Sequence, residues 1–307
     1  MVRLRGRAAA PGRLSAAAGG PRARYPPGRH DRGWPARATG RSPAARHPAA
    51  GRRLDRLRCM KVLLVGGAGL VGSFITPYLR PHHSLRVLDL RPPQHDVEYI
   101  PGSITSHDDL RRALEGMDVF INMVMKSPQG GSSNDQTLTE IVENYEVNTL
   151  GLHLLLWTAQ GMGIKRGVHT STMSVHYRER TWFPSEESVP LDTPSVYGLT
   201  KGFGEGICQY FARWFDMNLL ALRITGPRTR CQFLAERSSA SGEHHLYWTD
   251  EEDLARAYLA ALQAVQVGHG RFEAVFIAGD EAEQEHNLSK AHRLLGWEPQ
   301  SQKYLSG

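Results

Sequence analysis

The sequence predicts an α/β protein whose parallel sheet is covered by helices on both faces. From Met60 onward, short apolar runs alternate with helical patterns of period 3.6. Several runs are apolar at nearly every position, which is typical of strands buried on both faces. A glycine-rich turn joins the first run to the first helical pattern. Together these observations predict a doubly wound sheet of the Rossmann type with a small C-terminal substrate lobe.

Each predicted strand is an apolar run bounded by turn residues. The predicted strands are 61–65, 85–88, 97–100, 119–124, 167–170, 219–224 and 274–277. The predicted helices lie between most of them, at 70–79, 106–116, 138–161, 197–215 and 249–264. Two helices begin with a hydroxyl residue followed three positions later by an acid, a capping pattern: Ser106 with Asp109, and Thr249 with Glu252.

Residues 1–59 form a leader with a composition of its own. They hold 15 Arg, 13 Ala, 8 Gly and 7 Pro, no Lys, and only two acidic residues. Such a segment cannot bury enough apolar surface to offset its ordering entropy, so we expect it to be disordered. A basic tail, an organelle transit peptide and translation upstream of the true start are its three candidate origins. The third is favoured because Met60 opens a strand directly, and we expect a chain beginning at Met60 to fold.

The charge balance excludes some function classes once the leader is set apart. The leader carries a formal charge of +13 and residues 60–307 carry −7, so no basic patch of the body favours nucleic acid. No run of 18 apolar residues predicts a membrane span. Three cysteines without CxxC spacing predict neither a disulfide framework nor a thiolate zinc site, and no metal site is expected. We expect one cytoplasmic domain, 60–307, whose substrate-binding portion covers about 226–307.

The turn after the first strand has the spacing GxxGxxG, formed by Gly66, Gly69 and Gly72. Glycines at these places permit a tight turn, a close approach of the backbone to a diphosphate, and close packing of helix on strand. Seventeen residues after Gly72, Asp89 follows the second predicted strand. An acid there accepts hydrogen bonds from an adenosine ribose and repels a 2′-phosphate. The pattern therefore predicts NAD rather than NADP, a preference that Arg91 could weaken.

A second group of residues predicts acid–base chemistry. Tyr197 and Lys201 are four residues apart, so they share one face of a predicted helix. A phenol ordinarily titrates near pH 10, and a neighbouring ammonium would stabilise the phenolate and lower its pKa. Thr172 follows the fifth predicted strand, 25 residues before Tyr197. A hydroxyl there could polarise the substrate oxygen beside the phenol.

With these motifs in place, the chain resembles the extended branch of the short-chain dehydrogenase/reductase superfamily, the NAD-dependent epimerase/dehydratase group, from Met60 to about Pro299. Further matching stretches are Asn148, 172–175, 184–194, 197–201, Arg223 with 226–227, and 289–299. The resemblance implies a Rossmann fold, bound NAD, and a catalytic triad of Thr172, Tyr197 and Lys201.

Two strand ends depart from the pattern of this family. The third strand ends Gly102-Ser103-Ile104, without the usual aspartate, and the fourth ends in the bulky Met123-Val124-Met125. We still expect the strand ends and the catalytic helix to contact NAD. The expected contacts are Gly66, Gly69, Leu70, Val71, Gly72, Asp89, Leu90, Arg91, Ser103, Ile104, Met123, Val124, Tyr197 and Lys201.

The length after the sixth strand bears on the substrate. Members of the family that act on nucleotide sugars usually insert several tens of residues there, whereas only 21 residues separate Pro227 from Thr249. In this compactness the chain resembles the uronate dehydrogenases. A small sugar, sugar acid or polyol is the expected substrate. Its candidate contacts are Ser174, His176, Arg228 and Arg230, the two arginines being either a carboxylate clamp or a solvated loop.

Three functions remain open on the sequence. The favoured one is an NAD-dependent oxidoreductase that transfers a hydride between NAD and such a small molecule. The second is an NAD-dependent epimerase or dehydratase of nucleotide sugars. The third is a non-catalytic dinucleotide-binding protein, against which the complete triad argues. The oligomeric state is left open, with a homodimer as the assembly to test.

Overall fold

A computed structural model describes residues 59–126, 136–177, 179–239 and 248–301. The chain divides into two compact units, 1–48 and 49–307, and all the described residues belong to the second. The expectation that the leader is disordered therefore concerns residues that lie outside the described ranges.

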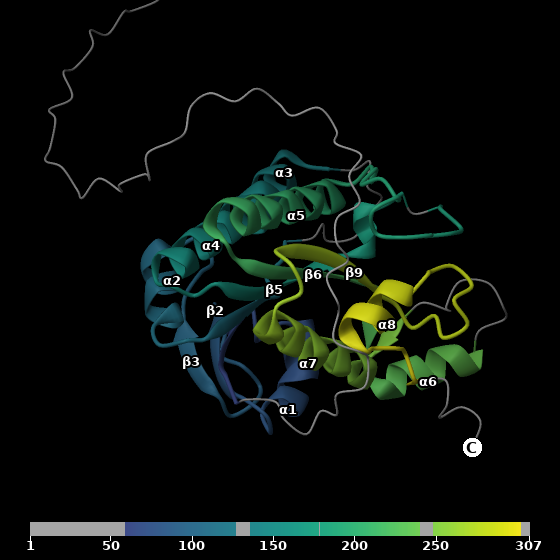
Figure 1. Cartoon of the computed structure of the whole chain (residues 1–307), viewed down its shortest axis with the longest axis horizontal. Helices are drawn as coiled ribbons and strands as arrows, with labels where there is room; N and C mark the ends of the chain where they lie inside the picture. The colour runs from purple at the N-terminus through teal and green to yellow at the C-terminus, as the bar shows by residue number, and fades with distance from the viewer. Residues whose placement is uncertain (1–58, 127–135, 178, 240–247, 302–307) are drawn as a thin grey trace, which may run out of the picture. The chain divides into compact units, whose positions relative to one another are not determined.

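One seven-stranded parallel sheet forms the centre of the described unit (Figure 1). Its strands, in spatial order, are β3 (Glu98–Pro101), β2 (Ser84–Asp89), β1 (Lys61–Val65), β4 (Val119–Asn122), β5 (Arg166–Thr172), β6 (Asn218–Ile224) and β9 (Phe272–Ile277). The order runs outward in both directions from β1 and β4, which confirms the predicted doubly wound fold. The switch point between β1 and β4 is where such sheets bind ligands, at the carboxyl ends of the strands.

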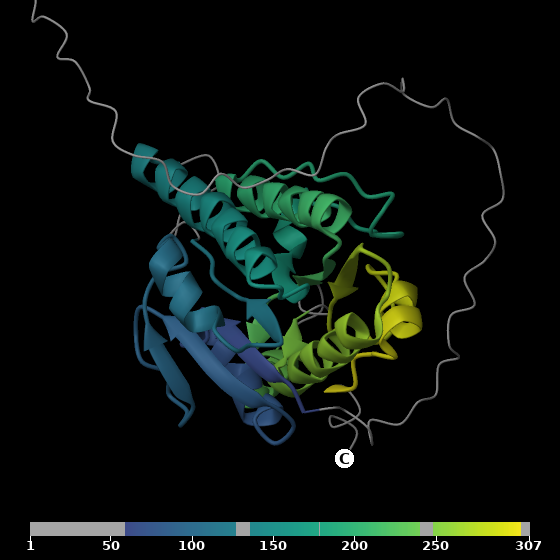
Figure 2. The same ribbon diagram turned by 60° about the vertical axis from the view of Figure 1, so that its left-hand side comes forward.

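Helices cover both faces of the sheet (Figures 1 and 2). On one face α1 (Leu70–Leu79) packs against α7 (Glu251–Val267), and these two helices share a buried apolar core with the sheet. On the other face α2 (His107–Leu114), α4 (Leu152–Gly161) and α5 (Val196–Phe215) cover a second core. No helix in the described part of the chain is long and apolar enough to cross a membrane.

The segment predicted as one helix, 138–161, has a change of helix type in its middle. It consists of α3 (Leu138–Asn144), a π-helical stretch (Tyr145–Gly151) and α4. Asn148, in the π-helical stretch, is buried, and its side chain exchanges hydrogen bonds of 2.8 and 2.9 Å with the backbone of Lys126. Its amide also donates to the hydroxyl of Thr200 (3.0 Å), the residue before Lys201. A π turn of this kind commonly marks a functional site.

Two local predictions are corrected. The helix predicted from Thr249 begins at Glu251, because the carboxylate of Asp250 caps it by accepting from Glu252 N and Asp253 N. Thr249 is buried, with its hydroxyl 2.9 Å from that of Thr225. The fourth strand ends at Asn122, two residues before the predicted end.

Only part of the expected C-terminal portion stands apart from the sheet. Residues 226–301 contain β7 (Pro227–Arg228), α6 (Arg230–Ser239), β8 (Thr249–Asp250), α7, β9 and α8 (Ser289–Leu295). Strand β9 pairs with β6 and α7 covers the sheet, so both belong to the central layers. The short β7–α6–β8 excursion remains for a substrate lobe.

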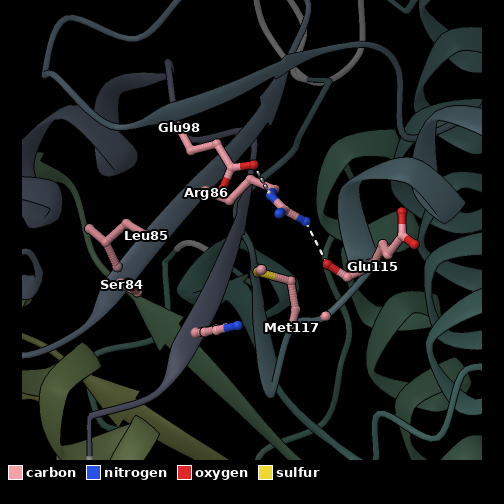
Figure 3. Close-up of a pocket in the computed structure, with 8 residues that line it drawn as sticks. Ser84, Leu85, Arg86, Glu98, Glu115 and Met117 are labelled. Atoms are coloured by element: carbon pink, nitrogen blue, oxygen red, sulfur yellow. Dashed lines mark hydrogen bonds and ion pairs between the residues drawn. The ribbon is translucent and has the colours of Figure 1, made fainter.

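A cavity of about 140 Å³ lies at the opposite, amino-terminal edge of the sheet (Figure 3). The guanidinium of Arg86 forms an ion pair with Glu98 (2.8 Å) and donates through Nη1 to the carbonyl oxygen of Glu115 (2.7 Å), so its charge already has a partner in the chain. Parallel sheets place their ligands at the carboxyl ends of the strands, away from this cavity.

Candidate active site

The glycine turn forms a cradle that excludes side chains. Gly66 has a positive φ of 82°, and a Cβ there would lie 2.9 Å from Val124 N. A Cβ on Gly72 would lie 2.3 Å from the carbonyl oxygen of Gly67, so a side chain would push α1 away from the turn. Gly69, at the start of α1, makes no side-chain capping bond to the first turn of the helix. The chemistry of this cradle, amide donors and a helix amino terminus, fits a diphosphate.

Asp89 connects this cradle to the end of β2. One carboxylate oxygen accepts from Ala68 N (3.0 Å) and the other from Arg91 N (3.1 Å). Each oxygen keeps a further lone pair, so the carboxylate can also accept from ribose hydroxyls. Leu90 is 75% exposed and Arg91 is exposed. Leu90 and Arg91 therefore face solvent just after β2. The Asp89 carboxylate links the glycine turn, through Ala68 N, to the backbone of Arg91.

The other predicted cofactor contacts differ in their accessibility. Ile104 and Met123 are buried in the two separate apolar cores, so their side chains pack inside the protein. Ser103 is half-buried, and its hydroxyl lies 2.8 Å from that of Thr105. Val124 faces the glycine turn and closes the cradle at Gly66. Leu70, which is 59% exposed, and the half-buried Val71 begin α1.

The three predicted catalytic residues come together at the carboxyl end of β5. Thr172, the last residue of that strand, is buried, and its Oγ1 accepts from Ser174 N (3.1 Å). Tyr197 lies in the first turn of α5 beside Thr172, and its hydroxyl donates to Met125 Sδ (3.5 Å). One turn later, the buried Lys201 donates through Nζ to the carbonyl oxygen of Thr170 (2.5 Å).

The pKa values of this group correct one prediction. Burial raises the pKa of Tyr197 to about 12, against the opposing effect of the Thr172 hydrogen bond. Burial lowers the pKa of Lys201 to about 8, while Cys208 and Glu205 act in the opposite direction. Lys201 was expected to lower the phenol pKa. The Lys201 ammonium is instead directed at the Thr170 carbonyl, and burial dominates both groups.

A buried ion pair that the sequence analysis did not single out lies beside the triad. Glu205 and Arg223 form a bidentate pair, with Nε–Oε1 and Nη2–Oε2 distances of 2.9 and 2.7 Å. Ser171 Oγ donates to the same carboxylate (2.6 Å). The pair therefore joins α5, one turn after Lys201, to the ends of β5 and β6. The sequence feature that could have revealed this pair is the i,i+4 spacing of Lys201 and Glu205, which places an acid on the buried face of the helix.

The same arginine also holds the loop between Thr172 and Tyr197. Arg223 Nη1 lies 3.2 Å from His176 Nε2 and donates to the carbonyl oxygen of Glu186 (3.1 Å). His176 Nδ1 lies 2.8 Å from the carbonyl oxygen of Pro190. His176 is thus 2% exposed with both ring nitrogens engaged by the chain, whereas Ser174 is exposed. His176 therefore connects the loop to Arg223 and Pro190 inside the protein and does not face solvent.

The segment that follows β9 anchors this loop from the other side. Phe183 N donates to the carbonyl oxygen of Glu285 (2.7 Å), and Asn287 N donates to that of Phe183 (3.0 Å). The rings of Phe183 and His286 stack with centroids 4.9 Å apart. The loop between Thr172 and Tyr197 is therefore fastened to the segment that follows β9.

Both arginines proposed for a substrate carboxylate already have carboxylate partners. Arg228 Nε lies 2.9 Å from Glu236 Oε2, and Arg230 Nη1 lies 2.8 Å from Asp250 Oδ2. Neither arginine extends freely into solvent, and each forms an ion pair with a carboxylate of the chain.

Sequence comparison assigns the family. Residues 62–277 match the NAD dependent epimerase/dehydratase family, and the chain belongs to it. It is 26% identical to a uronate dehydrogenase of Pseudomonas syringae pv. tomato, over 68% of this chain and 72% of that protein. It is 24% identical to an L-arabinose 1-dehydrogenase (NAD(P)(+)) of Haloferax volcanii, over 78% and 96%. The fold is shared with UDP-glucose 4-epimerase from Brucella ovis in complex with NAD, with a TM-score of 0.64, 17% identity and coverage of 79% and 94%.

Family membership makes this chain an NAD-dependent enzyme of the dehydrogenase and epimerase class. The glycine cradle and Asp89 fit that cofactor by their shape and donor set. The role of each residue in the site remains a prediction, and so does the identity of the substrate.

The preference for NAD gives the first test. Asp89→Ala is expected to weaken NAD binding roughly 10- to 100-fold, since a hydrogen bond to a charged group contributes about 1.5–3 kcal/mol. NADP binding should change less, so the gap between the two cofactors narrows. Asp89→Asn keeps acceptor capacity toward Ala68 N and serves as the control for the shape of the turn. Equal binding of both cofactors by the unchanged protein, measured by calorimetry, would contradict the assignment.

The buried His176 predicts acid sensitivity. Burial lowers its pKa from 6.5 to about 4, so the unfolded chain binds the extra proton in this window. Stability is therefore complete above pH 6.5 and falls as the pH drops toward 4, by roughly 3 kcal/mol for this group. Urea unfolding of His176→Gln should show a flatter pH dependence than the unchanged protein. His82→Gln, at an exposed histidine, should leave the slope unchanged.

Proposed function

We propose that this protein is an NAD-dependent oxidoreductase that oxidises or reduces a small sugar, sugar acid or polyol. The observation that carries the proposal is the meeting of Thr172, Tyr197 and Lys201 at the carboxyl end of β5. This group lies on the same sheet edge as the glycine cradle, which follows β1. A hydroxyl, a phenol and an ammonium beside a nicotinamide site suit alcohol oxidation and carbonyl reduction.

Each residue has a distinct part in the proposed reaction. NAD, when bound, supplies the hydride acceptor. In the oxidative direction Tyr197 must first be deprotonated; its phenolate oxygen then accepts the proton of the substrate hydroxyl, and the Thr172 hydroxyl steadies the oxygen on which charge develops. Lys201 contributes a positive charge next to β5, and with a pKa of about 8 it is largely charged at neutral pH. In the reductive direction the same groups return the proton to the substrate oxygen.

The size of the excursion after β6 supports a small substrate. Between Arg228 and Thr249 the described chain forms one short helix, α6. Strand β8 then pairs with β7, and α7 follows to cover the central sheet. Two of the similar proteins are a uronate dehydrogenase and an L-arabinose 1-dehydrogenase, whose names denote oxidation of single sugars. By the same analogy, the shared fold of a UDP-glucose 4-epimerase keeps the nucleotide-sugar reaction as the competing function.

Absorbance of NADH distinguishes the two functions. Free sugars, uronic acids and polyols are expected to give net reduction of NAD, whereas nucleotide sugars should neither react nor compete. An epimerase recycles its cofactor within the turnover and would show no net reduction. Tight binding of a nucleotide sugar, measured by calorimetry, together with no reduction of NAD by any free sugar, would favour the epimerase function instead. Assembly as a homodimer stays a prediction.

A further inference from the structure

Met125 places its thioether against the phenol of Tyr197. The Tyr197 hydroxyl donates to Met125 Sδ at 3.5 Å. A thioether sulfur is a weak acceptor, so the phenol can exchange this partner for a substrate oxygen at little cost. The chemical state of one sulfur atom therefore bears directly on the group proposed to move the proton.

The backbone on both sides of Met125 is held by asparagine side chains. Val124 N donates to Asn122 Oδ1 (3.2 Å), at the end of β4. Lys126 N donates to Asn148 Oδ1 (2.8 Å), and the Lys126 carbonyl oxygen accepts from Asn148 Nδ2 (2.9 Å). These bonds fix the point from which the Met125 side chain extends, so its sulfur stays close to the phenol.

The Met125 side chain is also open to solvent. It is 52% exposed, whereas Met123, two residues earlier, is 7% exposed. Among the methionines that the structure describes, only Met125 and Met162 are exposed. A small oxidant such as hydrogen peroxide can therefore reach the Met125 sulfur from solvent.

We propose that Met125 is a site of reversible oxidation by hydroperoxides, and that its sulfoxide inhibits the enzyme by accepting a hydrogen bond from Tyr197. The inference rests on the proposed function, since it concerns the same phenol. In this step the O–O bond of the peroxide breaks, one oxygen binds the sulfur, and the other leaves as water. The sulfur is oxidised and the peroxide is reduced. A methionine sulfoxide reductase reverses the step with thiols as the reductant, releasing the oxygen as water.

Oxidation converts the weak acceptor beside the phenol into a strong one. The new oxygen is bonded to a sulfur that lies 3.5 Å from Tyr197 Oη, which brings it within hydrogen-bond reach of the phenol. A hydrogen bond donated by the neutral phenol opposes its deprotonation. The phenol must lose its proton before it can accept one from the substrate hydroxyl. The sulfoxide should therefore lower kcat and leave NAD binding at the glycine turn nearly unchanged.

Met162 provides a matched control on the same molecule. It is 41% exposed and is the C-cap residue of α4. It lines a surface hollow with Asp118 and Lys165, the residues that directly precede β4 and β5, at the edge of the sheet opposite Tyr197. Its oxidation should leave the phenol unaffected.

The test treats the cofactor-free protein with hydrogen peroxide and then removes the peroxide with catalase. Dithiothreitol next reduces disulfides and sulfenic acids of the exposed Cys59 and Cys231, and it leaves methionine sulfoxides in place. Peptide mass spectrometry measures the sulfoxide at Met125 and Met162. Once Met125 is fully oxidised, kcat for the best sugar, sugar acid or polyol should be at least about tenfold lower. NAD affinity, measured by calorimetry, should be nearly unchanged, and methionine sulfoxide reductase should restore the rate.

Three variants assign the effect to one sulfur. Met162→Leu should lose as much activity on oxidation as the unchanged protein and regain it with the reductase. Met125→Leu, compared with its own untreated rate, should lose none, although it keeps Met162 and the exposed cysteines. Met125→Gln places a permanent amide oxygen near the phenol and should turn over slowly without peroxide. If Met125→Leu does not fold, the recovery of Met162→Leu with the reductase decides, because Met125 is then the only exposed methionine among the described residues.

Two results would overturn the inference and leave the oxidoreductase proposal standing. One is an unchanged kcat when Met125 is fully oxidised, or an equal loss on oxidation in Met125→Leu. The other is a Met125 that resists peroxide while Met162 is oxidised. Absence of NAD reduction by the untreated protein with every sugar, sugar acid and polyol would instead count against the proposed function.

Discussion

Replacing Tyr197 with phenylalanine is expected to reduce turnover by about 10²–10⁴-fold and to leave NAD affinity nearly unchanged. The change removes the phenolic oxygen, which contacts Thr172 and Met125, and keeps the ring that packs at the start of α5. Single-turnover measurements at saturating NAD, together with calorimetric titration of NAD, would separate chemistry from binding. Lys201→Ala should impair both, since its ammonium faces β5 beside the cradle.

A matched control lies on the same helix. Tyr210 is 47% exposed on α5, and Tyr210→Phe should retain full activity. A Tyr197→Phe protein as active as this control would refute the acid–base role of the phenol.

Breaking the Glu205–Arg223 pair should produce the largest loss of stability. Arg223→Met leaves the Glu205 carboxylate buried without its bidentate partner, and such changes cost about 3–5 kcal/mol. A loss of that size is a large share of the 5–15 kcal/mol by which domains are typically stable. Because Arg223 also holds His176 and Glu186, residual folded protein should turn over more slowly.

The appropriate comparison is an exposed pair. Arg271 lies 3.6 Å from Asp216 with both side chains largely in solvent, so Arg271→Met should lose less than about 1 kcal/mol. Urea unfolding measures both variants. A double variant, Glu205→Leu with Arg223→Met, should recover part of the loss, because it leaves no buried charge unpaired. Equal losses for Arg223→Met and Arg271→Met would mean that the buried pair adds little to stability.

The parts of the site that could be predicted are those encoded locally. Gly66, Gly69, Gly72 and Asp89 are separated by short, fixed intervals, and the positive φ of Gly66 and the close approach of Gly72 to Gly67 arise within the turn itself. Lys201 follows Tyr197 by one helical turn. The order of strands and helices also followed from periodicity, and no predicted end lies more than three residues from the observed one. Thr249 was misplaced as a cap because two neighbouring residues both have capping side chains, and only the fold decides between them.

The remaining features depend on contacts between distant residues. Arg223 meets Glu205 across 18 positions and His176 across 47, and no local pattern specifies that pairing. The carboxylate partners of Arg228 and Arg230 likewise come from α6 and from the start of α7. The direction of the pKa change at Tyr197 could not be foreseen, since it depends on how deeply the phenol is buried. Spacing could nominate Tyr197 and Lys201 as candidates, whereas the pKa values of these groups depend on the fold.

The fastening of the loop between Thr172 and Tyr197 to the segment after β9 has a consequence for biosynthesis. The glycine cradle is built from β1, β2 and β4, which leave the ribosome early. The loop that carries Glu187 must wait for Lys290, its ion-pair partner 103 residues later, and for the Phe183–His286 stack. Since domains generally fold as units, the loop is expected to be fastened only after the segment that follows β9 has left the ribosome, and turnover should begin only then.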